Sequence, residues 1–245
     1  MSRRRSRRER PRRTLVVVAA VLLVAAALGS VVLLYHPASS PHASSQAASS
    51  KYIILYVNQG NGAVNESNFA SMLSFASSHG FNTVFFQVYR QGTLLFDASQ
   101  LTYFVGQAHA RGMKIFFSLY LTNATQTLPT SVYGLGEDGI SLDMSSLSVS
   151  DQSSLLSSLR SGYGGTTAIT TTDLTLPLTP DILILETYTP QIQQYSQYIH
   201  PGVVAGVGVF ATTSYSDYEQ EYQYALANSS GVMVFDYAGL VKSGY

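Results

Sequence analysis

Two carboxylic acids end short apolar segments of this chain, and such a pair could perform acid–base chemistry on a glycosidic bond. Asp143 closes a five-residue run, and Glu186 lies near the end of the run Asp181–Tyr188. Because side chains alternate between the two faces of a strand, Asp143 lies opposite Ile140 and Leu142. Glycoside hydrolysis needs one acid that carries a proton and another that acts as nucleophile or base. We therefore predict that Asp143 is the nucleophile or base and that Glu186 is the general acid/base.

Further polar side chains fall where other apolar runs end. We predict that six of them bind substrate: Gln87, Tyr89, Arg90, Asp173, Tyr188 and Asp236. Asp236 is assigned to the site because it is in phase with Val232 and Val234 of the last run. Tyrosines at similar positions, Tyr56, Tyr120 and Tyr237, could stack on a sugar or pack in the core, and the sequence leaves both readings open.

Other kinds of catalytic site find little support in the sequence. His36 and His42 lie near the N-terminus, and His79, His109 and His200 fall at the ends of predicted helices. The chain contains no cysteine, no His-Glu-x-x-His segment and no Gly-x-Ser-x-Gly segment. We therefore predict neither a metal nor a cofactor.

Eight short apolar or β-branched runs would position these residues. They are Tyr52–Val57, Thr83–Tyr89, Lys114–Leu121, Gly139–Asp143, Thr166–Asp173, Asp181–Tyr188, Val203–Phe210 and Val232–Tyr237. Helical periodicity predicts helices between several of them, at Asn68–Ser78, Ser99–Arg111, from Ser150 or Asp151 onward, Gln191–Ile199 and Tyr215–Asn228. Alternating strands and helices indicate parallel βαβ units, and eight strands indicate a closed barrel. We predict a compact α/β fold, a (β/α)₈ TIM barrel preceded by one transmembrane helix.

The N-terminus combines a basic tail with an apolar segment. Residues 1–13 hold eight arginines, and residues 14–35 carry no charge and are mostly apolar. About 20 apolar residues suffice for a helix that crosses a bilayer, and a basic flank stays on the cytoplasmic side. We predict a signal anchor at residues 14–35 in the cell membrane, with the C-terminal domain outside. The alternative is a signal peptide that is cleaved near residues 25–30, which would release the domain as a secreted protein.

The remaining chain divides into a linker and one domain. Residues 36–50 are rich in Ser and Ala and predict a flexible linker, and residues 51–245 are long enough for one barrel. This domain holds six basic and 13 acidic residues, so its charge is near −7. A negative surface disfavours nucleic acid as a partner. Asn65, Asn123 and Asn228 begin Asn-x-Ser/Thr segments and are predicted glycosylation sites.

Four segments of the domain resemble a known group of proteins. The segment HGFNTVFFQVYRQG at residues 79–92 resembles a signature of glycosyl-hydrolase-like TIM-barrel families related to glycoside hydrolase family 10. Residues 108–115 (AHARGMKI), 138–143 (DGISLD) and 231–237 (GVMVFDY) are similar to their third, fourth and last strand segments. The resemblance implies an extracellular or envelope polysaccharide hydrolase, with Asp143 in its site and a polysaccharide or glycan as its partner.

The chain departs from that family pattern at three places. Arg90 stands one position after the family's arginine, Met144 replaces a second acid, and Glu186 lies where an amide-containing segment is more typical. The missing second acid and the short loops favour an alternative, a catalytically inactive TIM barrel that binds surface glycans or supports an envelope assembly. The common phase of Asp143, Glu186 and Asp236 at strand ends favours the hydrolase. The sequence leaves the sugar, the linkage and the oligomeric state open.

Overall fold

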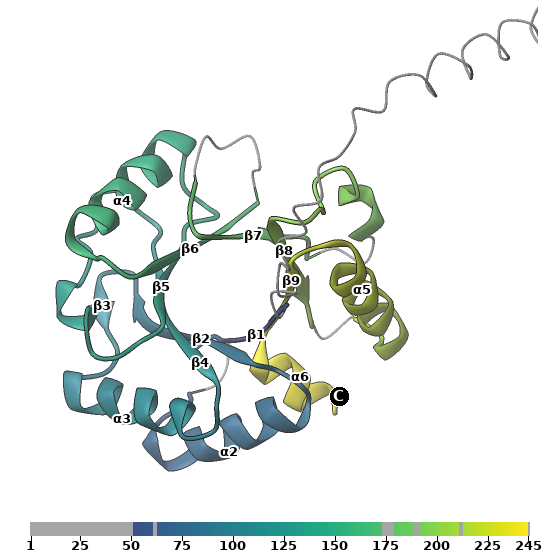
Figure 1. Ribbon diagram of the computed structural model, residues 1–245, viewed down its shortest axis with the longest axis horizontal. Helices are drawn as coiled ribbons and strands as arrows, with labels where there is room; N and C mark the ends of the chain where they lie inside the picture. The colour runs from purple at the N-terminus through teal and green to yellow at the C-terminus, as the bar shows by residue number, and fades with distance from the viewer. Residues whose placement is uncertain (1–50, 61–62, 173–178, 189–191, 211–212, 245) are drawn as a thin grey trace, which may run out of the picture. The chain divides into compact units, whose positions relative to one another are not determined.

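Eight parallel strands close into a barrel. The computed structural model describes residues 51–60, 63–172, 179–188, 192–210 and 213–244. The barrel strands are β1 (Tyr52–Val57), β2 (Thr83–Arg90), β4 (Lys114–Tyr120), β5 (Gly139–Asp143), β6 (Thr166–Thr171), β7 (Ile182–Glu186), β8 (Val203–Gly208) and β9 (Gly231–Phe235). Strand β1 pairs in parallel with both β2 and β9, which closes the ring (Figure 1). The predicted TIM barrel is therefore confirmed.

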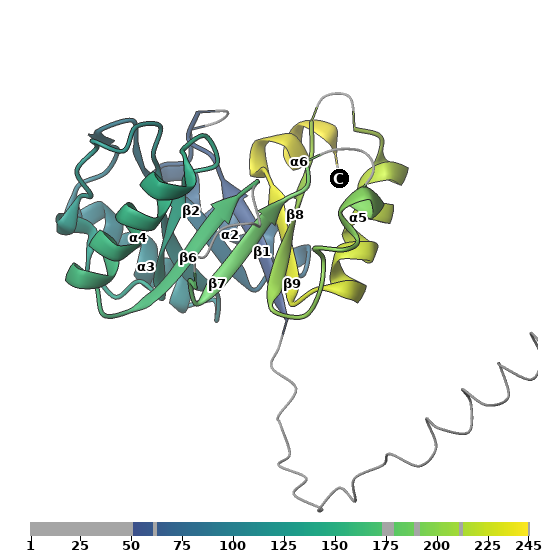
Figure 2. The same cartoon turned by 90° about the horizontal axis from the view of Figure 1, so that it is seen from above.

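Helices surround the barrel unevenly. They are α2 (Glu66–Ser78), α3 (Ala98–His109), α4 (Val149–Gly162), α5 (Tyr215–Asn228) and the seven-residue α6 (Tyr237–Ser243). Two 3₁₀ turns, η1 (Thr130–Val132) and η2 (Ile192–Tyr195), lie in other connections, and a short strand β3 (Thr93–Leu94) pairs antiparallel with β2. Figure 2 shows β6, β7 and β8 side by side at a tilt, with α4 at one flank and α5 at the other.

The helices begin where their sequences supply a cap. Asn65, Asp97, Ser148, Ser214 and Asp236 each accept a backbone N–H in the first turn of the helix that follows. Such a side-chain acceptor satisfies a donor that the helix itself leaves unpaired, and it stabilises a helix by about 0.5–2 kcal/mol. These caps fix where each helix starts relative to the strand that it covers.

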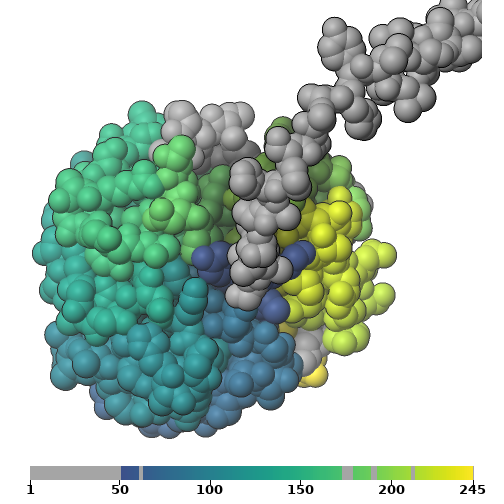
Figure 3. Space-filling view, in the orientation of Figure 1, coloured from purple at the N-terminus to yellow at the C-terminus, as the bar shows by residue number. Residues whose placement is uncertain are grey.

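Two apolar layers hold the barrel together. The inner layer is formed by side chains that point into the ring, and it includes Ile54, Phe85, Phe116, Ile184 and Met233. The outer layer lies between strands and helices and contains the alternate residues of the same strands. The inner-layer side chains are almost completely buried, so the barrel is a packed core and not an open pore. Figure 3 shows the outer surface of the domain in the orientation of Figure 1.

Two predicted helices have a different outcome. A helix is predicted at Gln191–Ile199, but the structure forms only the four-residue turn η2 there. This turn is sufficient to bury Ile192. The predicted membrane helix at 14–35 lies outside the described residues. Within the described ranges, the structure contains no helix with the length and apolar character needed to span a bilayer.

Candidate active site

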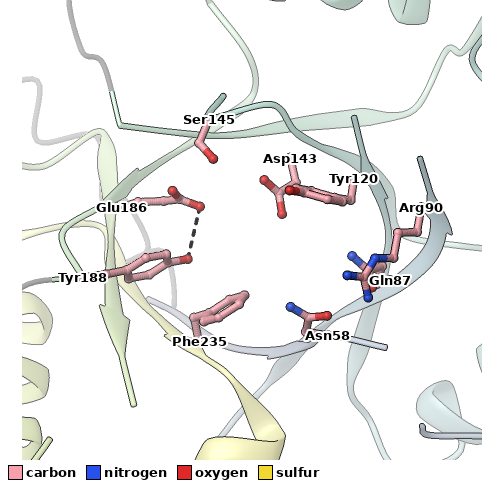
Figure 4. A pocket seen from close by; sticks show the side chains of 9 residues that line it. All are labelled: Asn58, Gln87, Arg90, Tyr120, Asp143, Ser145, Glu186, Tyr188 and Phe235. Carbon is pink, nitrogen blue, oxygen red and sulfur yellow. Dashed lines mark hydrogen bonds between the residues drawn. The ribbon is translucent and has the colours of Figure 1, made fainter. Parts of the chain in front are cut away.

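A polar pocket of about 210 Å³ opens where the barrel strands end. Its walls are formed by nine residues: Asn58, Gln87, Arg90, Tyr120, Asp143, Ser145, Glu186, Tyr188 and Phe235. Five of these are the last residues of their strands, and most of the others follow a strand end within two residues. Parallel strands of a closed barrel finish at the same rim, so residues from 58 to 235 meet around one cavity (Figure 4).

Asp143 lies deep in this pocket and is held by a tyrosine. Its side chain is buried, and its Oδ2 accepts a hydrogen bond of 2.9 Å from the hydroxyl of Tyr56. The same hydroxyl lies 3.0 Å from Oγ of Ser118, which fixes the tyrosine in turn. Burial raises the pKa of Asp143 to about 6, while the Tyr56 hydrogen bond acts to lower it. Asp143 is thus a carboxyl group that can gain or lose a proton near neutral pH.

Glu186 faces the same cavity from β7 and interacts with Asp143. Burial is the main cause that raises the pKa of Glu186 to about 7, and repulsion from Asp143 adds to it. The Tyr188 hydroxyl donates a hydrogen bond of 3.2 Å to Oε1 of Glu186 and opposes that rise. Because only Asp143 is bonded to the buried Tyr56 hydroxyl, the pair favours a proton on Glu186 and a charge on Asp143.

Aromatic rings line the side of the pocket next to Glu186. The rings of Tyr188 and Phe235 lie 5.1 Å apart, and Phe235 lies 5.2 Å from Tyr56. Phe210 is 41% exposed and packs near Tyr188, at 5.9 Å between centroids. Flat apolar faces beside hydroxyl groups suit a sugar ring, which is apolar on its faces and polar at its edges.

A bulge in β2 decides which residues of this strand reach the pocket. Gln87 pairs with Ser118 of β4, but the register shifts between Gln87 and Tyr89. Tyr89 consequently packs in the outer apolar layer, where its hydroxyl donates to the carbonyl of Thr127, and it does not line the pocket. The bulge turns Arg90 into the pocket instead.

Asp236 also lies elsewhere than predicted. Val232 and Val234 belong to the outer layer, whereas Met233 and Phe235 point into the barrel. Asp236 follows the outer phase, and its Oδ1 accepts the N–H of Gly239 at 2.9 Å as the N-cap of α6. It does not line the pocket, and the structure places it at the start of α6 and not at the predicted position in the site. Asp173 lies outside the described residues.

The remaining predicted sites lie on the surface. Asn65, Asn123 and Asn228 are all exposed, in the cap of α2, in the turn after β4 and at the end of α5. Their glycosylation stays a prediction. Among the residues with described positions, no three His, Cys, Asp or Glu side chains gather closely enough to hold a metal ion.

Sequence reasoning left several wall residues unassigned: Asn58, Tyr120, Ser145, Phe235 and, behind Asp143, Tyr56. Tyr56, Tyr120 and Phe235 lie at strand ends, and Asn58 and Ser145 follow strand ends. Position at a strand end was therefore the signal that could have found all of them. Residue type alone was insufficient, because Phe and Tyr are as common in strand cores.

Comparisons with solved structures agree with this architecture. A GH113 β-1,4-mannanase superposes with a TM-score of 0.54 at 8% identity, covering 77% of this chain and 88% of that chain. A complex of a GH113 β-1,4-mannanase gives a TM-score of 0.52 at 9% identity, with the same coverage. The xylanase-A-amylase inhibitor protein XAIP-III gives 0.51 at 13% identity, covering 79% of this chain and 96% of that chain. No family model and no curated protein sequence matches the chain. At these identities the shared feature is the fold, the TIM barrel.

Proposed function

We propose that the barrel hydrolyses glycosidic bonds in a cell-surface or environmental polysaccharide. The observation that carries this proposal is the facing pair of Asp143, which is buried, and Glu186, which is partly buried. The two carboxyl groups differ in proton affinity and line one pocket. The mannanases that share the fold act on β-1,4-mannan according to their names, and this supports a glycan as the substrate. Kinship with family 10 in particular stays a prediction.

The mechanism follows from the two environments. Glu186 keeps its proton at neutral pH more readily and would donate it to the glycosidic oxygen as the bond breaks. Asp143, whose charge is stabilised by Tyr56, would attack the anomeric carbon or activate a water that does so. Tyr188 and Phe235 would hold the sugar ring against the acids. The pocket is smaller than the roughly 300–1,000 Å³ of a typical small-molecule site, so its described walls enclose one sugar position.

A panel of polysaccharides tests the proposal directly. The domain formed by residues 51–245 is incubated with mannans, xylans, glucans, galactans and uronate-containing glycans, and newly formed reducing ends are measured. We expect hydrolysis of at least one substrate, with a bell-shaped dependence of kcat/KM on pH. The rising limb would follow deprotonation of Asp143 near pH 6, and the falling limb deprotonation of Glu186 near pH 7. No hydrolysis across the panel would contradict a hydrolase.

A glycan-binding barrel without catalysis is the second candidate. It is favoured by the inhibitor protein XAIP-III, which shares the fold and is named for inhibiting other enzymes. Met144, where the family pattern has a second acid, supports the same reading, because Met144 is fully buried and leaves that position without a carboxylate. Binding of a glycan by the wild type, without release of reducing ends, would establish this alternative.

We further propose that residues 14–35 anchor the domain on the outer face of the membrane, as the charge-free apolar segment and the arginines before it suggest. Protease added to intact cells is then expected to remove residues 51–245, while lysed cells lose the basic tail as well. Recovery of the domain from the medium, with a new N-terminus near Ser30, would instead support a cleaved signal peptide.

A further inference from the structure

One wall of the pocket presents only hydrogen-bond donors. Asn58, Gln87 and Arg90 lie together on the side away from Glu186 and Tyr188 (Figure 4). The guanidinium of Arg90 donates through all of its nitrogens and accepts nothing. The two amides could in principle present either an oxygen or a nitrogen, so their orientation decides the character of this wall.

Backbone donors fix the orientation of both amides. Oε1 of Gln87 accepts the N–H of Gln59 at 3.0 Å, and Oδ1 of Asn58 accepts the N–H of Gly60 at 2.7 Å. Because a backbone N–H can only donate, the atom that faces it must be the amide oxygen. The NH₂ groups of Asn58 and Gln87 therefore remain for the pocket.

Arg90 also lacks a local anionic partner. In the described ranges, no carboxylate lies within ion-pairing distance of its guanidinium. Arg90 is not among the causes that shift the pKa of Asp143 or of Glu186, so its charge is not used to neutralise the acids. The guanidinium lies directly against Gly60, where an added methyl group would overlap it.

The location of this cation is specific within the domain. Residues 51–245 contain only six basic side chains, and Arg90 is the one that lines this pocket. The other five lie elsewhere: Lys51 and Arg160 donate to backbone carbonyls of Leu226 and Thr179, Arg111 donates to Gln107, Lys114 lies over the ring of Tyr52, and Lys242 belongs to α6. Because the domain is acidic overall and has few basic residues, its composition alone does not lead one to expect a cation in the pocket.

We propose that this pocket takes an acidic sugar, a uronate, whose carboxylate is bound by Arg90 and by the amide groups of Asn58 and Gln87. A neutral hydroxyl has one proton to donate, and this wall of donors offers no acceptor for it. A carboxylate accepts only, and it can bind a guanidinium through two parallel hydrogen bonds. The charge on Asp143 repels the same carboxylate, so the sugar is oriented in one direction. This inference rests on the proposed glycan function and specifies its substrate class.

Matched pairs of methyl β-glycosides test the inference. The pairs are the glucuronide, galacturonide and mannuronide with the corresponding glucoside, galactoside and mannoside, and each pair differs only in the carboxylate at C6. Binding to residues 51–245 is measured by NMR titration for the wild type, Arg90→Gln, Arg90→Lys and the control Arg111→Gln. We expect at least one uronide to bind about tenfold or more tightly than its neutral partner, since a charge-assisted pair contributes at least 1.4 kcal/mol.

The variants separate charge from geometry. Arg90→Gln should reduce the preference to less than about twofold, and Arg90→Lys, which keeps the charge without the planar fork, should give an intermediate preference. Arg111→Gln, which removes a cation outside the pocket, should leave the preference unchanged. Gly60→Ala keeps the charge but displaces the guanidinium, and it should weaken uronide binding without altering binding of the neutral partner.

The outcomes are distinct from those of the hydrolysis panel. Equal binding of acidic and neutral partners, no binding of either, or a preference that survives Arg90→Gln overturns the acidic-sugar inference and leaves the hydrolase proposal to the panel. Uronide preference that depends on Arg90, in a protein that hydrolyses nothing, supports the inference and contradicts the hydrolase.

Discussion

The Asp143→Asn variant is expected to fold, to keep binding glycan and to lose hydrolysis by roughly 10²–10⁴-fold or more. Asparagine has nearly the shape of aspartate and can still accept the hydrogen bond of the Tyr56 hydroxyl. It cannot carry the negative charge that a nucleophile or base requires, so the loss falls on kcat and not on ground-state binding. Release of reducing ends and glycan binding are measured side by side for the wild type and the variant.

Stability gives this variant a second, independent readout. The pKa of Asp143 is raised in the folded state to about 6, above its unfolded value near 3.9, so the folded protein binds more protons between these two pH values. Stability from this group is therefore complete below about pH 4 and is lost as pH rises through about 6. Asparagine lacks this pH dependence. Above pH 7 the free energy of unfolding of the variant should therefore exceed that of the wild type by on the order of 3 kcal/mol, and at pH 4 the two values should be similar.

A control variant separates this effect from charge removal in general. Asp151→Asn removes a carboxylate from the first turn of α4, outside the pocket, and should not raise stability above pH 7. Glu186 and Glu221 also have a raised pKa, so the comparison between variant and wild type isolates Asp143. Equal hydrolysis by Asp143→Asn and the wild type would show that another acid does the chemistry, and Asp173 would be the next residue to replace.

The strands were predictable because each is a run of apolar residues that ends in polar ones. Strands β5 and β7 show most clearly why the two acids could be found. In β5 Ile140 and Leu142 are the strongly apolar positions, so the outer face was recognisable, and Asp143 had to point inward. In β7 Glu186 shares its phase with the inward-pointing Ile184. A charged residue at the end of such a strand is informative. Burying a carboxylate inside the barrel costs free energy, so its presence there indicates a role in the pocket.

The last strand shows where this reasoning fails. In β9 both faces are apolar, with Val232 and Val234 outside and Met233 and Phe235 inside. A strand that is buried on both sides carries no alternation, so its phase cannot be read from hydrophobicity. The choice of phase placed Asp236 in the site, whereas the structure uses it to cap α6.

Strand β2 fails for a different reason. A bulge needs no glycine or proline, and the segment from Gln87 to Arg90 contains neither. If side chains continued to alternate between the two faces of the strand beyond Gln87, Tyr89 would point to the rim. The structure inserts one residue, and Arg90 takes the place opposite Tyr120. Local patterns give the strand, but the pairing of β2 with β4 sets which side chain reaches the pocket.

The Glu186→Gln variant is expected to lose hydrolysis of natural glycans by about 10²–10⁴-fold and to retain most of its activity on substrates with a good leaving group. A sugar alkoxide is a poor leaving group and needs a proton as the bond breaks, which Gln cannot donate. A dinitrophenolate leaves without one. Rates with a natural oligosaccharide and with the dinitrophenyl glycoside of the same sugar are compared, with Glu66→Gln on the exposed surface of α2 as the control.

The pH profile of this variant separates an acid from a residue that only binds sugar. In the wild type the falling limb of kcat/KM near pH 7 reports loss of the Glu186 proton, so Glu186→Gln should abolish that limb and keep the rising limb of Asp143 near pH 6. A loss of equal size on both leaving groups, with the falling limb intact, would show that Glu186 positions the substrate and that another group is the acid. Asp143→Asn should lose hydrolysis of both substrates to the same extent. Only the proton donor becomes dispensable when the leaving group needs no proton, so the two variants together assign the two roles.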